Sequence, residues 1–192
     1  MPGRTIGRRG GGAPIAILTD FGYRDHYVGA MKGAIASIAP GAQLIDITHG
    51  VPPQSIAAGA IALAQSWRYF PARTIFLVVV DPGVGTARRA IAVETRTGAR
   101  FVGPDNGVLA PALEDAGPAR AVELNAVRYR RAQVSATFHG RDIFAPAAAH
   151  LWRGVRLEAL GKVIRDGLTP LDLPQAREGV DELRGEILYV DG

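Results

Sequence analysis

The chain has 192 residues and no cysteine, and 47% of its residues are apolar. That length suits one domain of ordinary size, or one domain and part of a second, and the composition is typical of a globular protein with its own core. The lack of cysteine excludes disulfides, thiolate nucleophiles and cysteine-based zinc sites. The formal net charge is +4, but the basic residues are scattered without interleaved aromatic residues, so we predict no nucleic-acid partner.

The start of the chain, residues 1–13, is basic and rich in glycine. It lacks the apolar middle of a secretion signal, so we expect a disordered basic tail and a cytoplasmic protein. The longest strongly apolar run extends from Ile75 to Val80 and is too short to cross a bilayer. We therefore predict no association with membranes.

Apolar strands and helices alternate in the first half of the chain. The segments in chain order are a strand at 14–19, a helix from 25 that ends before Pro40, a strand at 43–48, a helix at 54–69 and a strand at 74–80. Strands without polar alternation, interleaved with helices, indicate a sheet that is buried on both faces. The sequence thus predicts an α/β fold, with a mostly parallel sheet and helices on both faces.

The second half predicts a hairpin and further alternation. The segments are strands at 90–95 and 100–102 around Thr97 and Gly98, a helix at 106–115 capped by Gly117, a strand at 121–124 and a helix at 142–152. We expect these elements to complete one α/β domain at 14–167. A linker rich in proline and charge at 168–184 and a strand at 185–192 would then begin an incomplete C-terminal β domain.

Three aspartates accompany the predicted strands. In open α/β sheets, ligands bind beyond the carboxyl ends of the strands, where loop amides and helix N-termini converge. Asp20 and Asp81 lie just past their strands, whereas Asp46 lies within one and is predicted to be a packing or hydrogen-bonding residue. Asp20 and Asp81 are therefore the candidate ligand-binding carboxylates.

Common phosphate, serine and metal motifs match poorly. Gly83 and Gly85 follow Asp81, but Arg88 stands where a dinucleotide fingerprint has its third glycine, and no G-x-S-x-G sequence occurs. The histidines are His26, His49, His139 and His150. Their spacing matches no recognised ligand pattern, so we predict no metal.

Asp81 and Arg88 remain, together with His139 on a later loop before a helix. One interpretation is a functional cluster at the ligand-binding end of the sheet. The other is an ion pair that braces a loop, with His139 merely exposed. Both kinds of arrangement perturb ionisable groups, and the spacing alone leaves both open.

Five ordered motifs between Thr19 and Leu151 carry a family resemblance. They are TDFGYRDHYVGAMKG, IDITHGVPP, VVVDPGVGTARR, VGPDNGVL and TFHGRDIFAPAAAHL. Together they resemble the S-adenosyl-L-methionine (SAM) hydroxide adenosyltransferases, which are adenosine-forming SAM hydrolases related to fluorinase and chlorinase. This resemblance implies hydrolysis of SAM to adenosine and L-methionine by attack of water or hydroxide at C5′ of the ribose, with no cofactor.

The resemblance assigns the catalytic set to Asp81, Arg88 and His139, and the ribose-diol carboxylate to Asp20. The halogen-transferring relatives lack this catalytic set. The permanent charge of Arg88 would favour hydroxide over water. A carboxylate paired with arginine is a weaker base, so we expect Asp81 to position the water and His139 to accept its proton.

Further substrate contacts are expected around these residues. Phe21 and Phe138 would lend apolar or stacking surface, although either residue is also a plausible core residue. The remaining predicted contacts are Gly140, Asp105, Asn106 and Asp191. For Asp105 and Asn106, a turn residue and a helix cap are equally good interpretations. By the resemblance, Asp191 contacts the methionine part of the substrate.

The resemblance also implies a homotrimer with its sites at the subunit interfaces, where a β-rich C-terminal domain closes on a neighbouring subunit. Two alternatives to an enzyme stay open. The chain is either a SAM- or adenosine-binding module without turnover, or a subunit that needs another chain to complete its site.

Overall fold

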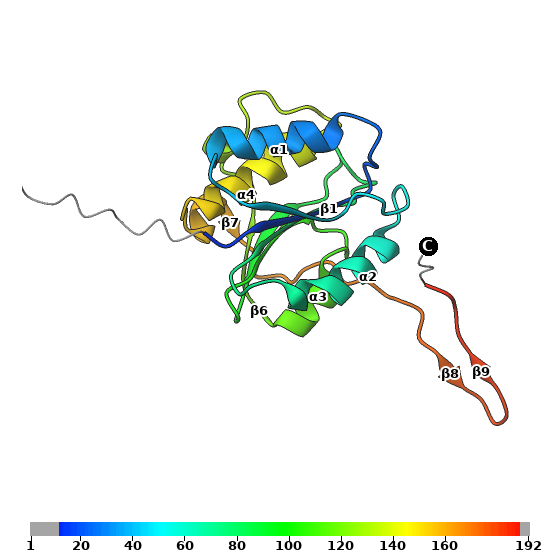
Figure 1. Cartoon of the computed structure of the whole chain (residues 1–192). Coiled ribbons are helices and arrows are strands. Elements are labelled where there is room, and N and C mark those ends of the chain that lie inside the picture. Colours follow the sequence, from blue (N-terminus) through cyan, green and yellow to red (C-terminus); the bar gives the residue numbers. More distant parts are fainter. Residues whose placement is uncertain (1–11, 189–192) are drawn as a thin grey trace, which may run out of the picture.

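The computed structural model describes residues 12–188, and its centre is a seven-stranded mixed sheet with helices on both faces (Figure 1). The strand order is β2-β1-β3-β5-β4-β6-β7. This confirms the predicted α/β class. The strands are β1 (Ile15–Thr19), β2 (Leu44–Thr48), β3 (Ile75–Val79), β4 (Ala90–Thr95), β5 (Arg100–Pro104), β6 (Pro118–Glu123) and β7 (Lys162–Val163).

The parallel half of the sheet contains the most buried strands. β1 pairs in parallel with β2 and β3, and β3 pairs in parallel with β5. Every residue of β1 and β3 is buried, whereas the edge strand β2 is only partly buried. Because helices cover both faces of β1 and β3, no polar alternation is needed there, which explains their continuous apolar sequences.

Two pairs of helices cover the two faces of the sheet (Figure 1). The helices are α1 (Tyr27–Ile38), α2 (Ile56–Ser66), α3 (Ala110–Ala116) and α4 (Ala145–Trp152). One apolar core lies between the sheet and α1 and α4, and a second lies between the sheet and α2 and α3. No helix within 12–188 is long and apolar enough to cross a membrane.

Short helical turns extend or precede the regular helices. They are η1 (Trp67–Tyr69), η2 (Val127–Tyr129), the π-helical turn η3 (Gly140–Phe144) and η4 (Leu157–Leu160). The predicted helix at 54–69 thus ends in a tighter turn, and the predicted helix at 142–152 begins with a wider one. Gly117 closes α3 in a left-handed conformation, with φ of 69°, as expected of a helix cap.

The predicted helix at 106–115 begins later than the sequence indicates. The Asn106 side chain accepts a hydrogen bond from the Val108 amide and donates one to the Val80 carbonyl. It therefore forms a turn that joins β5 to the end of β3, and the helix starts only at Ala110.

The C-terminal segment forms a small hairpin that projects from the sheet domain (Figure 1). In it, β8 (Arg177–Glu178) pairs antiparallel with β9 (Leu183–Arg184). The predicted strand at 185–192 is not a strand over its described part, 185–188, because the pairing falls before Gly185. The division into a tail, a domain, a linker and an incomplete second domain stays a prediction, and residues 1–11 of the tail lie outside the described residues.

Candidate active site

The carboxyl ends of β1 and β3 lie side by side, with Thr19 paired in register with Val79. Asp20 and Asp81 follow directly, so the sheet brings both carboxylates to one edge. A cavity of about 270 Å³ opens there. Six of the predicted site residues line it: Asp20, Phe21, Asp81, Phe138, His139 and Gly140.

Arg88 lies behind the cavity lining and joins two of these residues. Its Nε donates to both carboxylate oxygens of Asp81, at 2.9 and 3.1 Å, and its Nη2 contacts Asp81 Oδ2. The same Nη2 lies 2.7 Å from His139 Nδ1. The side chains of Arg88 and Asp81 are only 10% and 5% exposed. The structure therefore assembles the predicted catalytic set as one connected, partly buried cluster.

The contact with Arg88 fixes the tautomer of His139. A guanidinium can only donate hydrogen bonds, so Nδ1 must accept, and the single proton of the neutral ring is on Nε2. Burial and then the positive charge of Arg88 lower the pKa of His139 below its usual value. His139 is thus neutral near pH 7, and its remaining N–H is a hydrogen-bond donor.

This geometry does not support the prediction that His139 accepts the proton of the attacking water. The only lone pair on the neutral ring points at Arg88, and the lowered pKa makes the ring a poor base. Asp81 retains carboxylate lone pairs that the bonds from Arg88 do not occupy. The position of one guanidinium nitrogen therefore favours Asp81 over His139 as the proton acceptor.

Asp20 is held by the loop that follows β2. Its Oδ2 accepts a hydrogen bond of 2.7 Å from the Gln54 amide. Burial, with a smaller contribution from the neighbouring charge of Asp81, raises the pKa of Asp20 despite this bond. The carboxylate is therefore costly to keep ionised, which is typical of functional sites.

Aromatic side chains form one wall of the cavity. The Phe21 and Phe138 rings meet edge to face with centroids 5.8 Å apart, and Tyr27 packs against Phe138 at 5.2 Å. Gly140 allows Met31 and Phe21 to pack closely against its backbone, because a Cβ there would lie 3.1 Å from Met31 Sδ and 3.3 Å from the Phe21 ring. The two predicted phenylalanines therefore contribute both to the cavity and to the core.

Asp105 and Asn106 do not line this cavity, contrary to the prediction. Asp105 accepts from Arg89 Nε at 2.8 Å and from the Thr169 amide at 2.8 Å, so its side chain fastens the segment after β7. Asn106 forms the turn before α3. The structural interpretations of both residues are thus the ones observed, while Asp191 lies outside the described residues.

Residues that the sequence analysis did not predict as site residues complete the lining. They are Pro53, Gln54, Val79, Pro82, Val84 and Thr137. Gln54 is unusual, because its φ of 63° is in the left-handed region that favours glycine. No pattern in the sequence predicts that conformation, but the Pro-Pro pair before Gln54 was a signal for a constrained loop.

The loop after β3 and the loop before η3 lie in close contact. Gly85 has a φ of 79°, and a Cβ there would lie 2.6 Å from the Ala136 carbonyl oxygen. On the other loop, the fully buried Asp142 accepts from the Ser135 amide at 2.9 Å and from Arg141 Nε at 2.6 Å. These contacts hold the loop that carries Asp81 close to the loop that carries His139.

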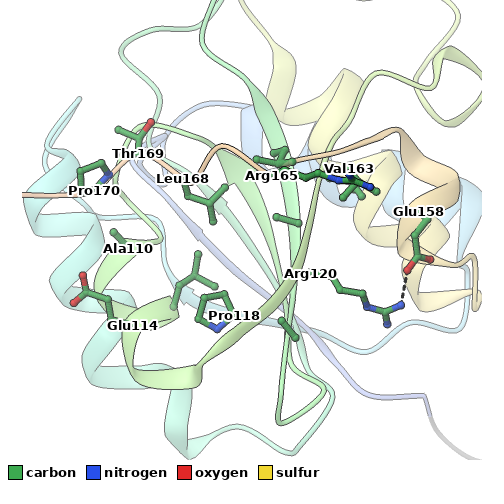
Figure 2. Close-up of a pocket in the computed structure, with 16 residues that line it drawn as sticks. Ala110, Glu114, Pro118, Arg120, Glu158, Val163, Arg165, Leu168, Thr169 and Pro170 are labelled. Carbon is green, nitrogen blue, oxygen red and sulfur yellow. Dashed lines mark hydrogen bonds and ion pairs between the residues drawn. The ribbon is translucent and has the colours of Figure 1, made fainter.

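Within residues 12–188, no cluster of three or more histidine, aspartate or glutamate side chains is placed to hold a metal ion. A wider cavity of about 630 Å³ lies between α3, β6 and the segment after β7 (Figure 2). Its lining includes Leu113, Arg120 and Leu168 but none of the predicted site residues.

Comparison with known proteins identifies relatives over most of the chain. Residues 15–161 match the family model described as the SAM hydroxide adenosyltransferase N-terminal domain. The chain is 47% identical over 179 residues to the (R)-S-adenosyl-L-methionine hydrolase of Salinispora tropica, a match that covers 92% of this chain and 68% of that protein. A more distant relative is a fluorinase from an Actinoplanes species, 28% identical over 174 residues, with 79% of this chain and 58% of the fluorinase covered.

The fold has a close counterpart among solved structures. The crystal structure of a conserved protein from Thermotoga maritima superposes with a TM-score of 0.85 and 43% identity. The superposition covers 92% of this chain and 67% of that one. Together with the family match, this similarity shows that the chain belongs to the SAM hydroxide adenosyltransferase family.

Proposed function

We propose that this protein hydrolyses SAM to adenosine and L-methionine by attack of water at C5′ of the ribose. The observation that carries the proposal is the connected, partly buried cluster of Asp81, Arg88 and His139 at the cavity beyond the strand ends. The names of the relatives, which are SAM hydrolases, support the same substrate and reaction.

The charge of the cluster suits a sulfonium substrate. With Asp20 and Asp81 ionised, Arg88 positive and His139 neutral, these four residues together have a net charge of minus one. A sulfonium bears one positive charge, and opposite charges attract strongly where water is excluded. A neutral thioether such as S-adenosylhomocysteine would lack this attraction.

The reaction needs a positioned water and a proton acceptor. In our proposal, the water donates a hydrogen bond to Asp81 and accepts one from His139 Nε2–H, which leaves an oxygen lone pair for C5′. The new C5′–O bond forms as the C5′–S bond breaks, and the bonding pair stays on sulfur as neutral methionine. The proton passes through Asp81 to solvent, so each turnover releases one proton. Arg88 acts through the other two residues and is a positioning residue.

Asp20 would bind the ribose. A carboxylate accepts hydrogen bonds from both vicinal hydroxyls, and the amide of Gln54 occupies only part of its capacity. The binding of the diol beside Asp81 would bring C5′ towards the water, and such positioning accounts for a large share of many rate enhancements.

The cavity is small for the whole substrate. Its volume of about 270 Å³ is below the range typical of pockets that enclose a drug-sized ligand. We therefore propose that this part of the chain holds the ribose and the reacting atoms. Other protein surface would complete the site, consistent with the homotrimer that we expect.

Two consecutive arginines provide a matched test. Arg88 joins Asp81 to His139, whereas Arg89 pairs with Asp105 and Asp166 away from the cavity. The purified chain is incubated with SAM, and adenosine and methionine are measured by chromatography. We expect Arg88→Gln to reduce adenosine release at least about a hundredfold, and Arg89→Gln to reduce it by less than about threefold.

Equal slow release by both variants and the wild type would overturn the proposed catalytic cluster. Binding of SAM without release of products would instead favour a binding module. Because the names of the relatives specify the R configuration at sulfur, the assay uses both sulfonium epimers separately. We expect faster release from the R epimer.

A further inference from the structure

His49 is a buried imidazole that the proposed mechanism does not use. It directly follows β2, it is 1% exposed, and it does not line the cavity. Burying a polar ring costs free energy unless the ring finds partners, so its contacts indicate its purpose.

Three hydrogen-bond contacts join His49 to the segment that carries Asp20. Its Nδ1 lies 2.8 Å from the Thr19 hydroxyl oxygen, which also accepts a hydrogen bond from the Phe21 amide. The His49 carbonyl accepts from the Gly22 amide at 2.8 Å, and the His49 amide donates to the Tyr23 hydroxyl at 3.0 Å. Asp20 lies within this bonded segment, directly after Thr19.

The other side of the imidazole faces an acidic group. His49 Nε2 lies 3.1 Å from Asp46 Oδ1, while Lys32 Nζ holds the second oxygen of that carboxylate at 2.7 Å. The contact between Nε2 and Asp46 is too poorly aligned for a regular hydrogen bond. The negative charge of the Asp46 carboxylate nevertheless favours the tautomer with its proton on Nε2. Nδ1 is then the acceptor, and the Thr19 hydroxyl donates to it.

The same loop reaches Asp20 from its far end. Gln54 donates its amide to Asp20 Oδ2 from a left-handed backbone conformation that costs free energy for any residue except glycine. The segment from His49 to Gln54 therefore contacts the Asp20 region twice, through an imidazole on one side and an amide on the other. The amide holds the Asp20 carboxylate directly, and the imidazole holds the neighbouring residue Thr19.

We infer that His49 is a positioning residue, which acts through the Thr19 hydroxyl to hold the Asp20 carboxylate in the orientation that binds a ribose diol. The inference rests on the proposed function, since it concerns how the same site recognises its substrate. It predicts that loss of the imidazole acceptor weakens recognition of the diol specifically.

The test measures diol selectivity, which is the ratio of the affinities for adenosine and for 2′,3′-dideoxyadenosine. A charged hydrogen bond to the diol gives the wild type a ratio of at least about ten. His49→Leu and Thr19→Val each remove one partner of the contact and should bring the ratio close to one. His49→Asn retains an acceptor at the position of Nδ1 and should keep most of the selectivity.

Thr74 provides the matched control for Thr19. Both threonines are fully buried, and both hydroxyls are hydrogen-bonded, but Thr74 lies at the opposite end of the sheet, just before β3. Thr74→Val therefore removes a comparable buried hydroxyl and should lower stability while leaving the selectivity unchanged. If His49→Leu does not fold, the volume-matched Thr19→Val variant decides the test.

Retention of the wild-type ratio by folded Thr19→Val and His49→Leu proteins would overturn the inference. Loss of the ratio in Thr74→Val would do so as well, since the effect would then follow stability and not position. A wild-type protein that neither prefers the diol nor releases adenosine from SAM would instead remove the proposed function, and the inference with it. These outcomes are distinguishable in one set of measurements.

Discussion

The binding role proposed for Asp20 conflicts with the stability of the folded protein. Burial raises the pKa of Asp20, whereas the proposed function requires its charge. A carboxyl whose folded pKa is raised stabilises the fold below its usual titration range. It loses that contribution as the pH rises through the folded value. At neutral pH, the ionised Asp20 therefore opposes folding.

Asp20→Asn should consequently stabilise the protein. The neutral amide can still accept from Gln54 through its oxygen, and it is no longer repelled by Asp81. We expect the free energy of unfolding at pH 7 to rise by up to about 1 kcal/mol, measured by urea denaturation. Adenosine binding should weaken in the same variant, and a variant that is both less stable and fully active would contradict this account of Asp20.

The lowered pKa of His139 predicts a simple pH profile. The neutral ring is the form that accepts from Arg88, so activity requires deprotonation. Since the pKa lies below the usual value of 6.5, kcat/KM should be constant above that pH and should decline only at more acidic pH. An acid limb centred above the usual histidine value would show that His139 is not held in this way.

The same shift affects stability. Because the folded pKa of His139 is lowered, its contribution is complete above the usual value and is lost as the pH falls through the folded value. His139→Gln should therefore reduce the loss of stability between neutral and mildly acidic pH, as measured by thermal unfolding at several pH values.

At the level of elements, two loops of the candidate site are in close backbone contact at Gly85 and Ala136. Gly85 in the loop after β3 leaves no room for a Cβ beside the Ala136 carbonyl. Gly83 in the same loop lacks a positive φ, and a Cβ there would make only ordinary contacts of 3.4 Å or more.

This difference predicts unequal effects of two alanine substitutions. Gly85→Ala should destabilise the protein by about 1–3 kcal/mol and reduce adenosine release, because the two loops must separate. Gly83→Ala should change the free energy of unfolding by less than about 1 kcal/mol. Denaturation and product release measure both effects. Similar effects of the two substitutions would contradict the role given to the close contact between Gly85 and Ala136.

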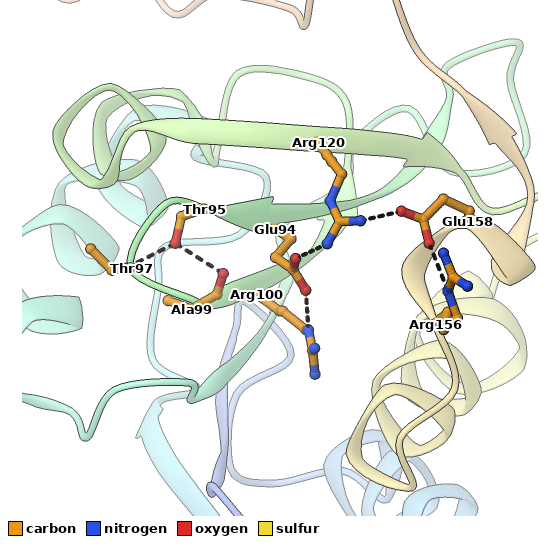
Figure 3. Close-up of polar contacts among 8 residues, drawn as sticks. All are labelled: Glu94, Thr95, Thr97, Ala99, Arg100, Arg120, Arg156 and Glu158. Carbon is orange, nitrogen blue, oxygen red and sulfur yellow. Dashed lines mark hydrogen bonds and ion pairs between the residues drawn. The ribbon is translucent and has the colours of Figure 1, made fainter.

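An ion-pair network joins the antiparallel strands to η4 (Figure 3). Glu94 on β4 accepts from Arg100 Nε on β5 at 2.9 Å and pairs with Arg120 on β6, which also pairs with Glu158. Although partial burial opposes ionisation of Glu94, the hydrogen bonds from Arg120 and Arg100 lower its pKa overall. Its contribution is therefore present above the usual glutamate value of 4.5 and is lost as the pH falls.

Glu94→Gln should destabilise the protein by about 1 kcal/mol at pH 7. The difference from the wild type should shrink below the usual titration range of glutamate. Urea denaturation at neutral and acidic pH measures both values. Glu114→Gln is the control, since the described residues provide no ion pair for Glu114. A loss of stability that does not change with pH would show that Glu94 acts through packing and not through its charge.

For the whole molecule, the sequence predicts the order and type of the elements well. Continuous apolar runs and helical spacing are local sequence patterns, and the folded chain contains the strands and helices that they predict. The structure also brings residues 81, 88 and 139 together, because Asp81 follows β3, Arg88 precedes the antiparallel strand β4 at the same edge, and His139 lies on the loop that crosses to this edge before η3. These features follow from local pattern and topology.

What the sequence could not provide depends on distant contacts. Asp105 stands in a motif at a strand end, as Asp81 does, but its side chain turns to Arg89 and Thr169. Gln54 contacts Asp20 through its main-chain amide, in a rare backbone conformation. The residue type at position 54 predicts neither the contact nor the conformation. The tautomer of His139 depends on a guanidinium from another loop. Such details are decided by tertiary contacts rather than by spacing.

The proposed trimer is a prediction about the assembly. Light scattering after size exclusion should give a mass of about three times 20.3 kDa. We expect adenosine release per chain to decrease on dilution, because dissociation would expose the incomplete cavity. A monomer that is fully active at all concentrations would contradict this part of the account.

The most direct test of the proposed chemistry follows the oxygen atom. SAM is incubated with the protein in water enriched in heavy oxygen, and the products are analysed by mass spectrometry. Attack of water at C5′ predicts one heavy oxygen in the 5′-hydroxyl of adenosine, unlabelled methionine, and one proton released per adenosine. Unlabelled adenosine, or cleavage of SAM at another bond, would contradict the role proposed for Asp81, Arg88 and His139.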